Sequence, residues 1–323
     1  MNVTSVLPRD AIPSIDEPSF ATEYFGEPDD EAIVVDGSPP RAYPIRILSY
    51  HEIVNDVLEA DGSTRSAPAA ENGRPITVTW CPICASAVVY DRVVDGRRLM
   101  FGTSGKLADD ALVMYDRETG SEWKQPLGTC IDGPLEGEEL SALPASLVSM
   151  DQFRSAHPDG VVLQPVHGSE DGRLPRAVYG MEPYDRYFAD EEFGLRAMRG
   201  EGEQRTWVRE DIDSKTPVLG VVHGGEAVGY PRPQVEAAGG VVTDSVGGLD
   251  VVVLAFEGGL HAFEDPEYRF EVRDGSLIAD GSSWDPATGR SDDGRQLDRV
   301  PSRRLFAFAW RDDHGDGSFY GLD

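Results

Sequence analysis

The sequence contains almost no lysine. Lysine occurs only at positions 106, 124 and 215, although the chain has 323 residues and 29 lysines and arginines together. Aspartate and glutamate number 58, which gives a formal net charge of -29. A surface rich in carboxylates and poor in lysine keeps its hydration where dissolved salt screens the repulsion between charges. We interpret the chain as a halophilic cytoplasmic protein, and we expect neither nucleic acid nor a membrane as a partner.

Long apolar runs are also lacking, and cysteine is scarce. No apolar stretch approaches the roughly 20 residues of a membrane-spanning helix. The first 20 residues have neither the basic start nor the apolar core of a signal peptide. Three cysteines are too few for a disulfide framework. With 40% apolar residues, the chain can still bury a core and is not a disordered protein.

Short apolar runs alternate with turn residues along most of the chain, which predicts a mainly β fold with a few short helices, of the α+β class. One helix is expected from Ser49, because residues 49–52 match a capping box ahead of the stretch Ile-Val-Asn-Asp-Val-Leu (residues 53–58). A second helix is expected within residues 147–156, ended by Pro158 and Gly160.

Two parts of the chain resemble each other. Residues 32–56 match residues 218–244, and each part carries a Tyr-Pro pair and a following aspartate. Further on, both parts contain an Asp-x-x-Thr-Gly stretch, at residues 116–120 and 285–289, which is typical of a turn. Histidines 157 and 314 also match, and we expect both to follow a helix in a structural role. Residues 76–91 match residues 250–264 as well. These four matches in the same order indicate an internal duplication.

The duplication predicts four regions. Residues 1–30 form an N-terminal arm with several prolines, residues 31–165 form the first repeat, residues 166–215 form a connector, and residues 216–323 form a degenerate second repeat. Matched without gaps, Cys81 falls on Leu254 and Cys84 on Glu257, while His51 and Glu52 fall on glycines 239 and 240. Only the first repeat therefore carries cysteine and histidine at these positions, which favours it as the site of function.

Trp80 and the Cys-Pro-Ile-Cys turn (residues 81–84) stand between two strand-like runs. A Cys-x-x-Cys turn places two sulfurs on one side, where they can share a metal ion or form a disulfide. A thioredoxin fold is disfavoured because no long helix follows, and a rubredoxin or zinc-ribbon site would need a second Cys-x-x-Cys.

Three interpretations of this turn remain open. In the first, Cys81, Cys84 and His51 bind zinc, copper or iron, with Cys130 or solvent as a fourth ligand, and the protein is a metal-binding protein or an oxidoreductase. In the second, the cysteines are a thiol redox pair in which Cys81 attacks and Cys84 resolves. In the third, they only pack within a binding or scaffold module. Whether the chain is an enzyme stays open.

The glycine-containing residues 101–106 add two candidates. Their backbone N–H groups can cradle an anion, although a tight turn explains them equally well. Lys106 and Ser104 are candidates for orienting a polar or anionic substrate, since lysine is so rare in this chain. We expect a small-molecule or metal ligand, and the sequence points to no particular protein partner.

The motifs taken together resemble one family. Five motifs occur in the order found in the family called domain of unknown function 3179. They are His-Glu-Ile-Val-Asn-Asp, the stretch around Cys-Pro-Ile-Cys, Phe-Gly-Thr-Ser-Gly-Lys, the Asp-x-x-Thr-Gly stretch with its following Trp, and His-Pro-Asp-Gly. The resemblance is strong over residues 30–165 and looser beyond. It implies functional positions at His51, Glu52, Cys81, Cys84, Ser104, Gly105, Asp116 and Trp123, but it does not imply a reaction. Cys130 is not part of this pattern.

Overall fold

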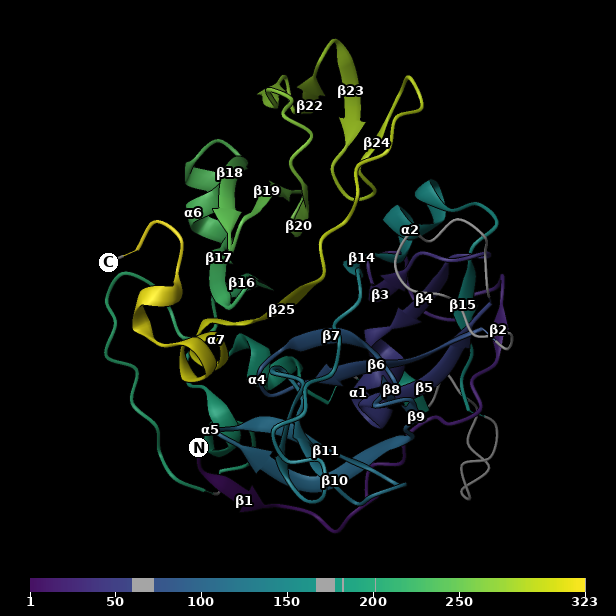
Figure 1. The fold of residues 1–323 in the computed structure, drawn as a ribbon, viewed down its shortest axis with the longest axis vertical. Helices are drawn as coiled ribbons and strands as arrows, with labels where there is room; N and C mark the ends of the chain where they lie inside the picture. The colour runs from purple at the N-terminus through teal and green to yellow at the C-terminus, as the bar shows by residue number, and fades with distance from the viewer. Residues whose placement is uncertain (60–72, 167–177, 182, 201, 323) are drawn as a thin grey trace. The chain divides into compact units, whose positions relative to one another are not determined.

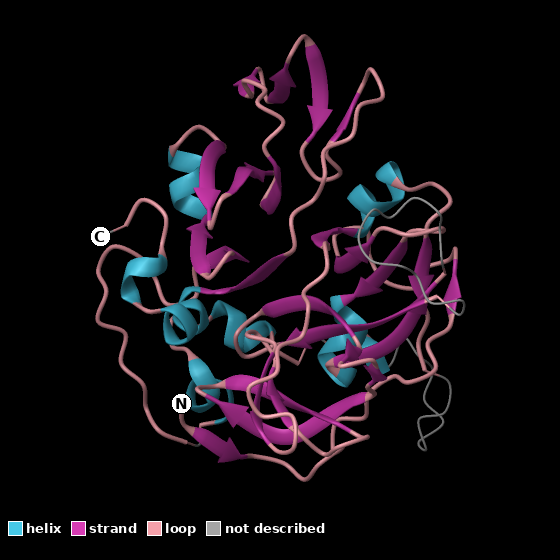
Figure 2. Ribbon diagram, viewed as in Figure 1, coloured by secondary structure: helices cyan, strands magenta, loops and turns pink. Residues whose placement is uncertain are grey.

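The computed structural model describes residues 1–59, 73–166, 178–181, 183–200 and 202–322. Strands far outnumber helices in these residues, so the predicted mainly β fold with short helices is confirmed (Figure 2). The chain divides into a first unit, residues 1–143 and 148–205, and a second unit, residues 144–147 and 206–323. Among the described residues, no helix is both long and apolar enough to cross a membrane.

Most strand pairs of the first unit are antiparallel, and the pair of β15 with β4 is parallel. One sheet has the order β1-β10-β11-β12-β13, with β1 Val3–Ser5, β10 Phe101–Ala108, β11 Ala111–Asp116, β12 Glu122–Lys124 and β13 Thr129–Asp132. A meander joins β5 Ile53–Leu58, β6 Arg74–Cys81 and β7 Ser86–Asp91. A further group of paired strands comprises β3 Glu31–Val35, β4 Arg41–Pro44, β15 Val161–Leu163 and β2 Phe20–Ala21. A further short pair is formed by β8 Val93–Val94 and β9 Arg97–Arg98.

The meander lies against the sheet that contains β10 and β11 (Figure 1). Asn55 on β5 joins the two layers, because its amide nitrogen donates to the carbonyl of Phe101 and its amide oxygen accepts from the Phe101 N–H. Gln125 makes a second link by donating to the Thr79 hydroxyl over 2.8 Å. These buried polar contacts fix how β6, which ends at Cys81, faces β11.

The short helices described in the first unit include α1 Ile45–His51, α2 Met150–Ala156, α4 Asp185–Ala189 and α5 Gly194–Arg199. The strand β14 Ser146–Ser149 leads directly into α2, whose capping box is made by Ser149 and Gln152. The predicted helix within residues 147–156 is therefore confirmed, with a later start. His157 caps its end, as expected.

The helix predicted from Ser49 is wrong. Helix α1 begins at Ile45, directly after Pro44, and Ser49 lies in its last turn. Proline suits a helix start because its φ is already near the helical value, here -61°. The β-branched residues after Glu52 then pair with β6 over the whole of β5, so long-range strand pairing overrides the local capping pattern.

The second unit repeats this order of elements. A hairpin of β16 Pro217–His223 and β17 Glu226–Pro231 leads into α6 Arg232–Ala237, and a meander of β18 Val241–Val246, β19 Leu249–Phe256 and β20 Gly259–Glu264 follows. In the first unit, β3, β4, α1 and the meander β5–β7 have the same order. The remaining elements are β21 Glu271–Arg273, β22 Ser276–Ala279, β23 Ser282–Asp285, β24 Arg290–Ser291, β25 Ser302–Phe306, α7 Ala307–His314 and the 3-10 turn Asp316–Ser318.

Matching contacts accompany this matching order. The hydroxyl of Tyr43 donates to Asp56, and the hydroxyl of Tyr230 donates to Asp244. Both Asp-x-x-Thr-Gly stretches form the expected turn, in which the aspartate accepts from the threonine N–H and the glycine has a positive φ.

Two glycines of the second unit make room for a buried indole. Gly220 and Gly229 are cross-strand partners on β16 and β17. A Cβ atom on either would overlap the ring of Trp310, which is fully buried. The indole N–H donates to the carbonyl of Ser318. The core of this unit therefore depends on the absence of side chains at two positions.

Candidate active site

The Cys-Pro-Ile-Cys turn closes the hairpin between β6 and β7, as the sequence predicts. Cys81 ends β6 and lies opposite Ser86, the first residue of β7. Residues 82–85 form the loop, and Ala85 adopts a positive φ of 49° to close it. Both cysteines are free thiols and are buried, with exposed fractions of 1% for Cys81 and 0% for Cys84.

Hydrogen-bond donors surround the sulfur of Cys81. The backbone N–H of Leu112 on β11 donates to Sγ over 3.4 Å. The N–H groups of Ile83 and Cys84 and the thiol of Cys84 are the further donors. Burial acts to raise the pKa of Cys81, but these hydrogen bonds, led by the one from the Cys84 thiol, outweigh it and lower the pKa. Cys81 is therefore the sulfur better suited to be a thiolate, the nucleophilic form of cysteine.

Glu52 lies next to this sulfur. It caps the end of α1 in a left-handed conformation, with a φ of 57°, and its carbonyl accepts from the N–H of Trp80 on β6. The side chain is 7% exposed. Burial, followed by the negative charge of Cys81, raises the pKa of Glu52 to about 8, while the charge of Arg199 acts in the opposite direction. Glu52 therefore holds its proton at neutral pH.

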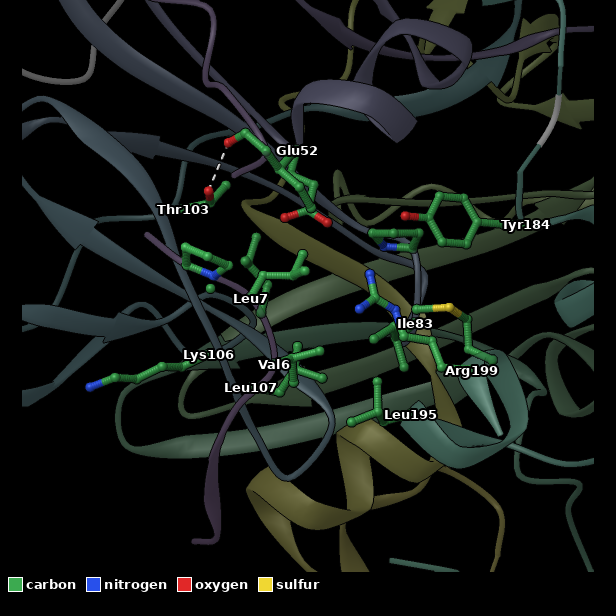
Figure 3. Close-up of a pocket in the computed structure, with 16 residues that line it drawn as sticks. Val6, Leu7, Glu52, Ile83, Thr103, Lys106, Leu107, Tyr184, Leu195 and Arg199 are labelled. Carbon is green, nitrogen blue, oxygen red and sulfur yellow. Dashed lines mark hydrogen bonds between the residues drawn. The ribbon is translucent and has the colours of Figure 1, made fainter. Parts of the chain in front are cut away.

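The carboxyl group of Glu52 has no hydrogen-bond partner within the described residues. It points into a cavity that it shares with Tyr184 and Arg199 (Figure 3). Its oxygens reach the cavity, where they can bind a polar group that enters it. This feature marks the cavity as a place for a ligand.

The second unit has a glycine where the first has Glu52. The N–H of Ala255 donates to the carbonyl of Gly240, as the N–H of Trp80 donates to that of Glu52. Both acceptors have a positive φ, which glycine adopts at no steric cost. Counted from this bond, Cys81 corresponds to Phe256, two residues from the position given by the ungapped match. The glutamate is thus a costly residue at this backbone position, and the first unit retains it.

The cavity is small and mostly apolar. Its volume is about 50 Å³, which is room for a few water molecules or a small organic group. Glu52, Thr103, Lys106, Tyr184 and Arg199 supply its polar side chains. The apolar lining consists of Val6, Leu7, Pro8, Ile12, Pro82, Ile83, Leu107, Leu112, Leu195 and Met198. Cys81 stands just behind this wall, and Leu112 and Glu52 border both the sulfur and the cavity.

Residues 184–199 cover one side of the Cys-Pro-Ile-Cys turn. The hydroxyl of Tyr187 on α4 donates to the carbonyl of Ile83 over 2.7 Å and accepts from the N–H of Gly194 at the start of α5. Helix α5 then places Leu195, Met198 and Arg199 on the cavity wall (Figure 3). This segment lies in the predicted connector, where the sequence showed only a cluster of tyrosines.

The N-terminal segment supplies another wall. The N–H groups of Val6 and Leu7 both donate to the carbonyl of Gly105. Gly105 lies in a bulge of β10 with a φ of 75°, and a Cβ atom there would overlap the backbone of Leu7. Gly105 is therefore part of an irregular strand, where the sequence suggested a tight turn or an anion cradle, and it lets the N-terminal segment approach β10.

Ser104 and Lys106 are held by the protein itself. The hydroxyl of Ser104 donates to the carbonyl of Val113 and accepts from the N–H of Lys106. Although Lys106 lines the cavity, its ammonium group forms an ion pair of 2.7 Å with Glu122. Their proposed role in orienting a substrate stays a prediction, and these contacts give each a structural role as well.

The structure does not bring His51 together with the cysteines as metal ligands. One ring nitrogen of His51 contacts the carbonyl of Pro13 and the other contacts the hydroxyl of Tyr179, each at 2.8 Å. Cys130 lies on β13, where its thiol donates to the carbonyl of Asp132. No group of three or more potential ligands was found among the described residues. The zinc, copper or iron site therefore stays a prediction without support from this arrangement.

Asp116 and Trp123, which the family resemblance implies, stabilise the scaffold. The carboxylate of Asp116 accepts from the indole N–H of Trp123 over 3.0 Å and from the N–H and hydroxyl of Thr119. Both residues are fully buried. They hold the turn between β11 and β12, and thereby the strand that presents Leu112 to Cys81.

A comparison with protein-family models matches residues 9–317 to the family described as protein of unknown function (DUF3179). The comparisons with curated proteins and with solved structures found no match. The family match covers nearly the whole chain, including both units and every residue of the candidate site except Val6, Leu7 and Pro8. The chain therefore belongs to the DUF3179 family.

Proposed function

We propose that this protein is a thiol redox protein in which Cys81 is the attacking thiolate and Cys84 the resolving thiol. The observation that carries this proposal is the set of donors around the Cys81 sulfur, three backbone N–H groups and the neighbouring thiol. Such an arrangement stabilises a thiolate more than a thiol. It gives the two sulfurs different roles, which mere packing would not require.

The reaction is a two-electron exchange. The Cys81 thiolate attacks an electrophilic atom of an oxidant, and the leaving group takes the electron pair of the broken bond and a proton. The Cys84 thiol then attacks the sulfur of Cys81, giving a Cys81–Cys84 disulfide and releasing the second product. A low-molecular-weight dithiol restores the two thiols and is itself oxidised to a disulfide.

The metal-binding interpretation and the scaffold interpretation make different predictions. A metal shared by Cys81, Cys84 and His51 would have to displace one of the two contacts that the ring nitrogens of His51 make with Pro13 and Tyr179. A scaffold role predicts that the cysteines never become oxidised. We favour the redox interpretation because a nucleophilic Cys81 makes use of the donors on its sulfur, and a departing group can take the buried proton of Glu52.

Peptide mass spectrometry tests the proposal. After mild oxidation and blocking of free thiols, we expect a Cys81–Cys84 disulfide that a dithiol reverses. Cys130→Ser should leave the disulfide unchanged, whereas Cys84→Ser should leave Cys81 oxidised without an intramolecular bond. Absence of the bond under every oxidant, with about one equivalent of a transition metal in the purified protein, would favour the metal-binding interpretation instead.

We also infer that the two units arose by internal duplication. The shared order of hairpin, helix and meander supports this inference, as do the two tyrosine–aspartate hydrogen bonds. In this view the second unit lost, or never gained, the glutamate and the cysteines. The comparison between Glu52 and Gly240 then separates a residue kept for function from one kept for its backbone conformation.

A further inference from the structure

The size of the cavity limits which oxidants can react with Cys81. A volume of about 50 Å³ and an exposed fraction of 1% for Cys81 leave no room for a disulfide carried by another protein. A compact molecule of a few heavy atoms fits this space. The lining is apolar over most of its area, which favours an organic group over a fully hydrated one.

The proton on the buried carboxyl of Glu52 indicates the chemical class of the oxidant. When a thiolate attacks a disulfide, the leaving group is another thiolate, whose conjugate acid has a pKa of about 8.5 and needs no proton donor near neutral pH. When a thiolate attacks a peroxide, the leaving group is an alkoxide or hydroxide, and the pKa of water is about 15.7. Such a leaving group departs readily only if an acid protonates it.

We propose that the oxidant is a small organic hydroperoxide, that Glu52 donates the proton to the departing alkoxide, and that Arg199 stabilises the negative charge on that oxygen. This inference rests on the thiol redox function proposed above. Three observations support it: the carboxyl group of Glu52, in a residue 7% exposed, is aimed into the cavity, the guanidinium group of Arg199 lines the same cavity, and the sulfur of Cys81 lies next to Glu52. In thiol–disulfide exchange, the leaving group would need no proton from Glu52, because a thiolate leaves without protonation.

The steps balance as follows. The Cys81 sulfur forms a bond to the terminal oxygen of ROOH as the O–O bond breaks, and the alkoxide takes the proton of Glu52 to leave as ROH. The resulting sulfenic acid at Cys81 reacts with the Cys84 thiol to give the disulfide and water. A dithiol reductant then returns both cysteines to thiols, and Glu52 regains its proton from solvent.

Among the described residues, three with titratable or charged side chains face Glu52. They are Cys81 from β6, Arg199 from α5 and Tyr184 from the segment before α4. Lys106 lines the same cavity with its ammonium group paired to Glu122. Because Glu52 must be protonated to act, the reaction with hydroperoxide should slow above its pKa of about 8, by about tenfold per pH unit. Reaction with a small disulfide needs only the thiolate and should not slow there.

The test compares oxidants on the full-length protein in concentrated KCl. We would follow formation of the Cys81–Cys84 disulfide after mixing with tert-butyl hydroperoxide, hydrogen peroxide or 2-hydroxyethyl disulfide. We expect tert-butyl hydroperoxide to react fastest. In Glu52→Gln, which keeps shape and charge but cannot donate a proton, its rate constant should fall about 100-fold, and that of the disulfide by less than about threefold.

Matched variants control for indirect effects. Glu138→Gln removes an exposed carboxylate and should change none of the rates. Arg199→Gln should slow the hydroperoxide reaction by about tenfold, whereas Arg196→Gln, on the same helix but outside the cavity wall, should not. If Glu52→Gln does not fold, the pH profile of the unmodified protein still distinguishes the outcomes.

Each outcome has a defined meaning. A faster reaction with 2-hydroxyethyl disulfide, or equal loss of both rates in Glu52→Gln, would overturn the hydroperoxide inference and leave the thiol redox function standing. A faster reaction with hydrogen peroxide would overturn the organic part of the inference. No Cys81–Cys84 disulfide with any of the three oxidants would overturn the redox function itself.

Discussion

Replacing Glu52 by glutamine should change how the stability of the protein depends on pH. In the folded protein the pKa of Glu52 is raised from an ordinary 4.5 to about 8, chiefly by burial. In the unfolded chain this carboxyl releases its proton near its ordinary pKa. Between these values the folded protein binds more protons than the unfolded chain, so its free energy of unfolding falls as pH rises.

The expected size follows from the two pKa values. One pKa unit corresponds to about 1.4 kcal/mol, so Glu52 should cost roughly 5 kcal/mol of folding free energy above pH 8 relative to pH 4.5. Stabilities of whole proteins are about 5–15 kcal/mol, so this is a large fraction. Glutamine has no proton to lose and should remove the contribution of Glu52 to the pH dependence of stability. The variant should therefore gain stability over the unmodified protein as pH rises through this window.

Urea unfolding at fixed KCl concentration, repeated from pH 4.5 to pH 9, measures this difference. The other carboxylates titrate in both proteins, so subtracting one curve from the other isolates Glu52. Glu138→Gln provides the control, because that side chain is exposed. Parallel stability curves for Glu52→Gln and the unmodified protein over the whole range would refute the assignment of a buried, protonated carboxyl.

Three further substitutions test the scaffold and the turn. Gly220→Ala should destabilise the second unit by about 3 kcal/mol, because the added methyl group overlaps the ring of Trp310. Thermal unfolding would measure this loss of stability. An unchanged unfolding temperature would show that the core can adjust. Arg92→Met should lower the free energy of unfolding by about 3 kcal/mol, because the buried guanidinium group donates to three backbone carbonyls. Urea unfolding would measure this loss, with Arg98→Met at an exposed position as the control. Equal losses in the two variants would contradict the prediction. Tyr187→Phe should lower the free energy of unfolding by about 1 kcal/mol, because the Cys-Pro-Ile-Cys turn loses a hydrogen bond. The same change should speed alkylation of Cys81 by iodoacetamide. An unchanged alkylation rate would mean that Tyr187 does not limit access to Cys81.

The sequence predicts local features of this protein well. Strand periodicity on both sides of the Cys-Pro-Ile-Cys turn, the Asp-x-x-Thr-Gly turns and the helix before His157 are all set by neighbouring residues. The helix expected from Ser49 fails for the same reason. Its capping pattern is local, whereas the conformation of residues 53–58 depends on pairing with residues 74–79, which come later in the chain.

The surroundings of the site could not be predicted in this way. Tyr187 contacts Ile83 across 104 positions of sequence, and Arg199 comes from a polar segment without a clear pattern. The raised pKa of Glu52 is a product of burial, which no local pattern reports. The sequence assigns Glu52 to a capping box at the start of a helix. In the structure it instead follows the end of α1 in a left-handed conformation.

That conformation has a consequence for selection. Glu52 combines a backbone geometry that costs a non-glycine residue roughly 1 kcal/mol with a buried acid, while Gly240 has the same geometry without either burden. Variants selected only for heat resistance should therefore accumulate glycine at position 52. Variants selected for survival under the conditions in which the site is needed should keep glutamate there.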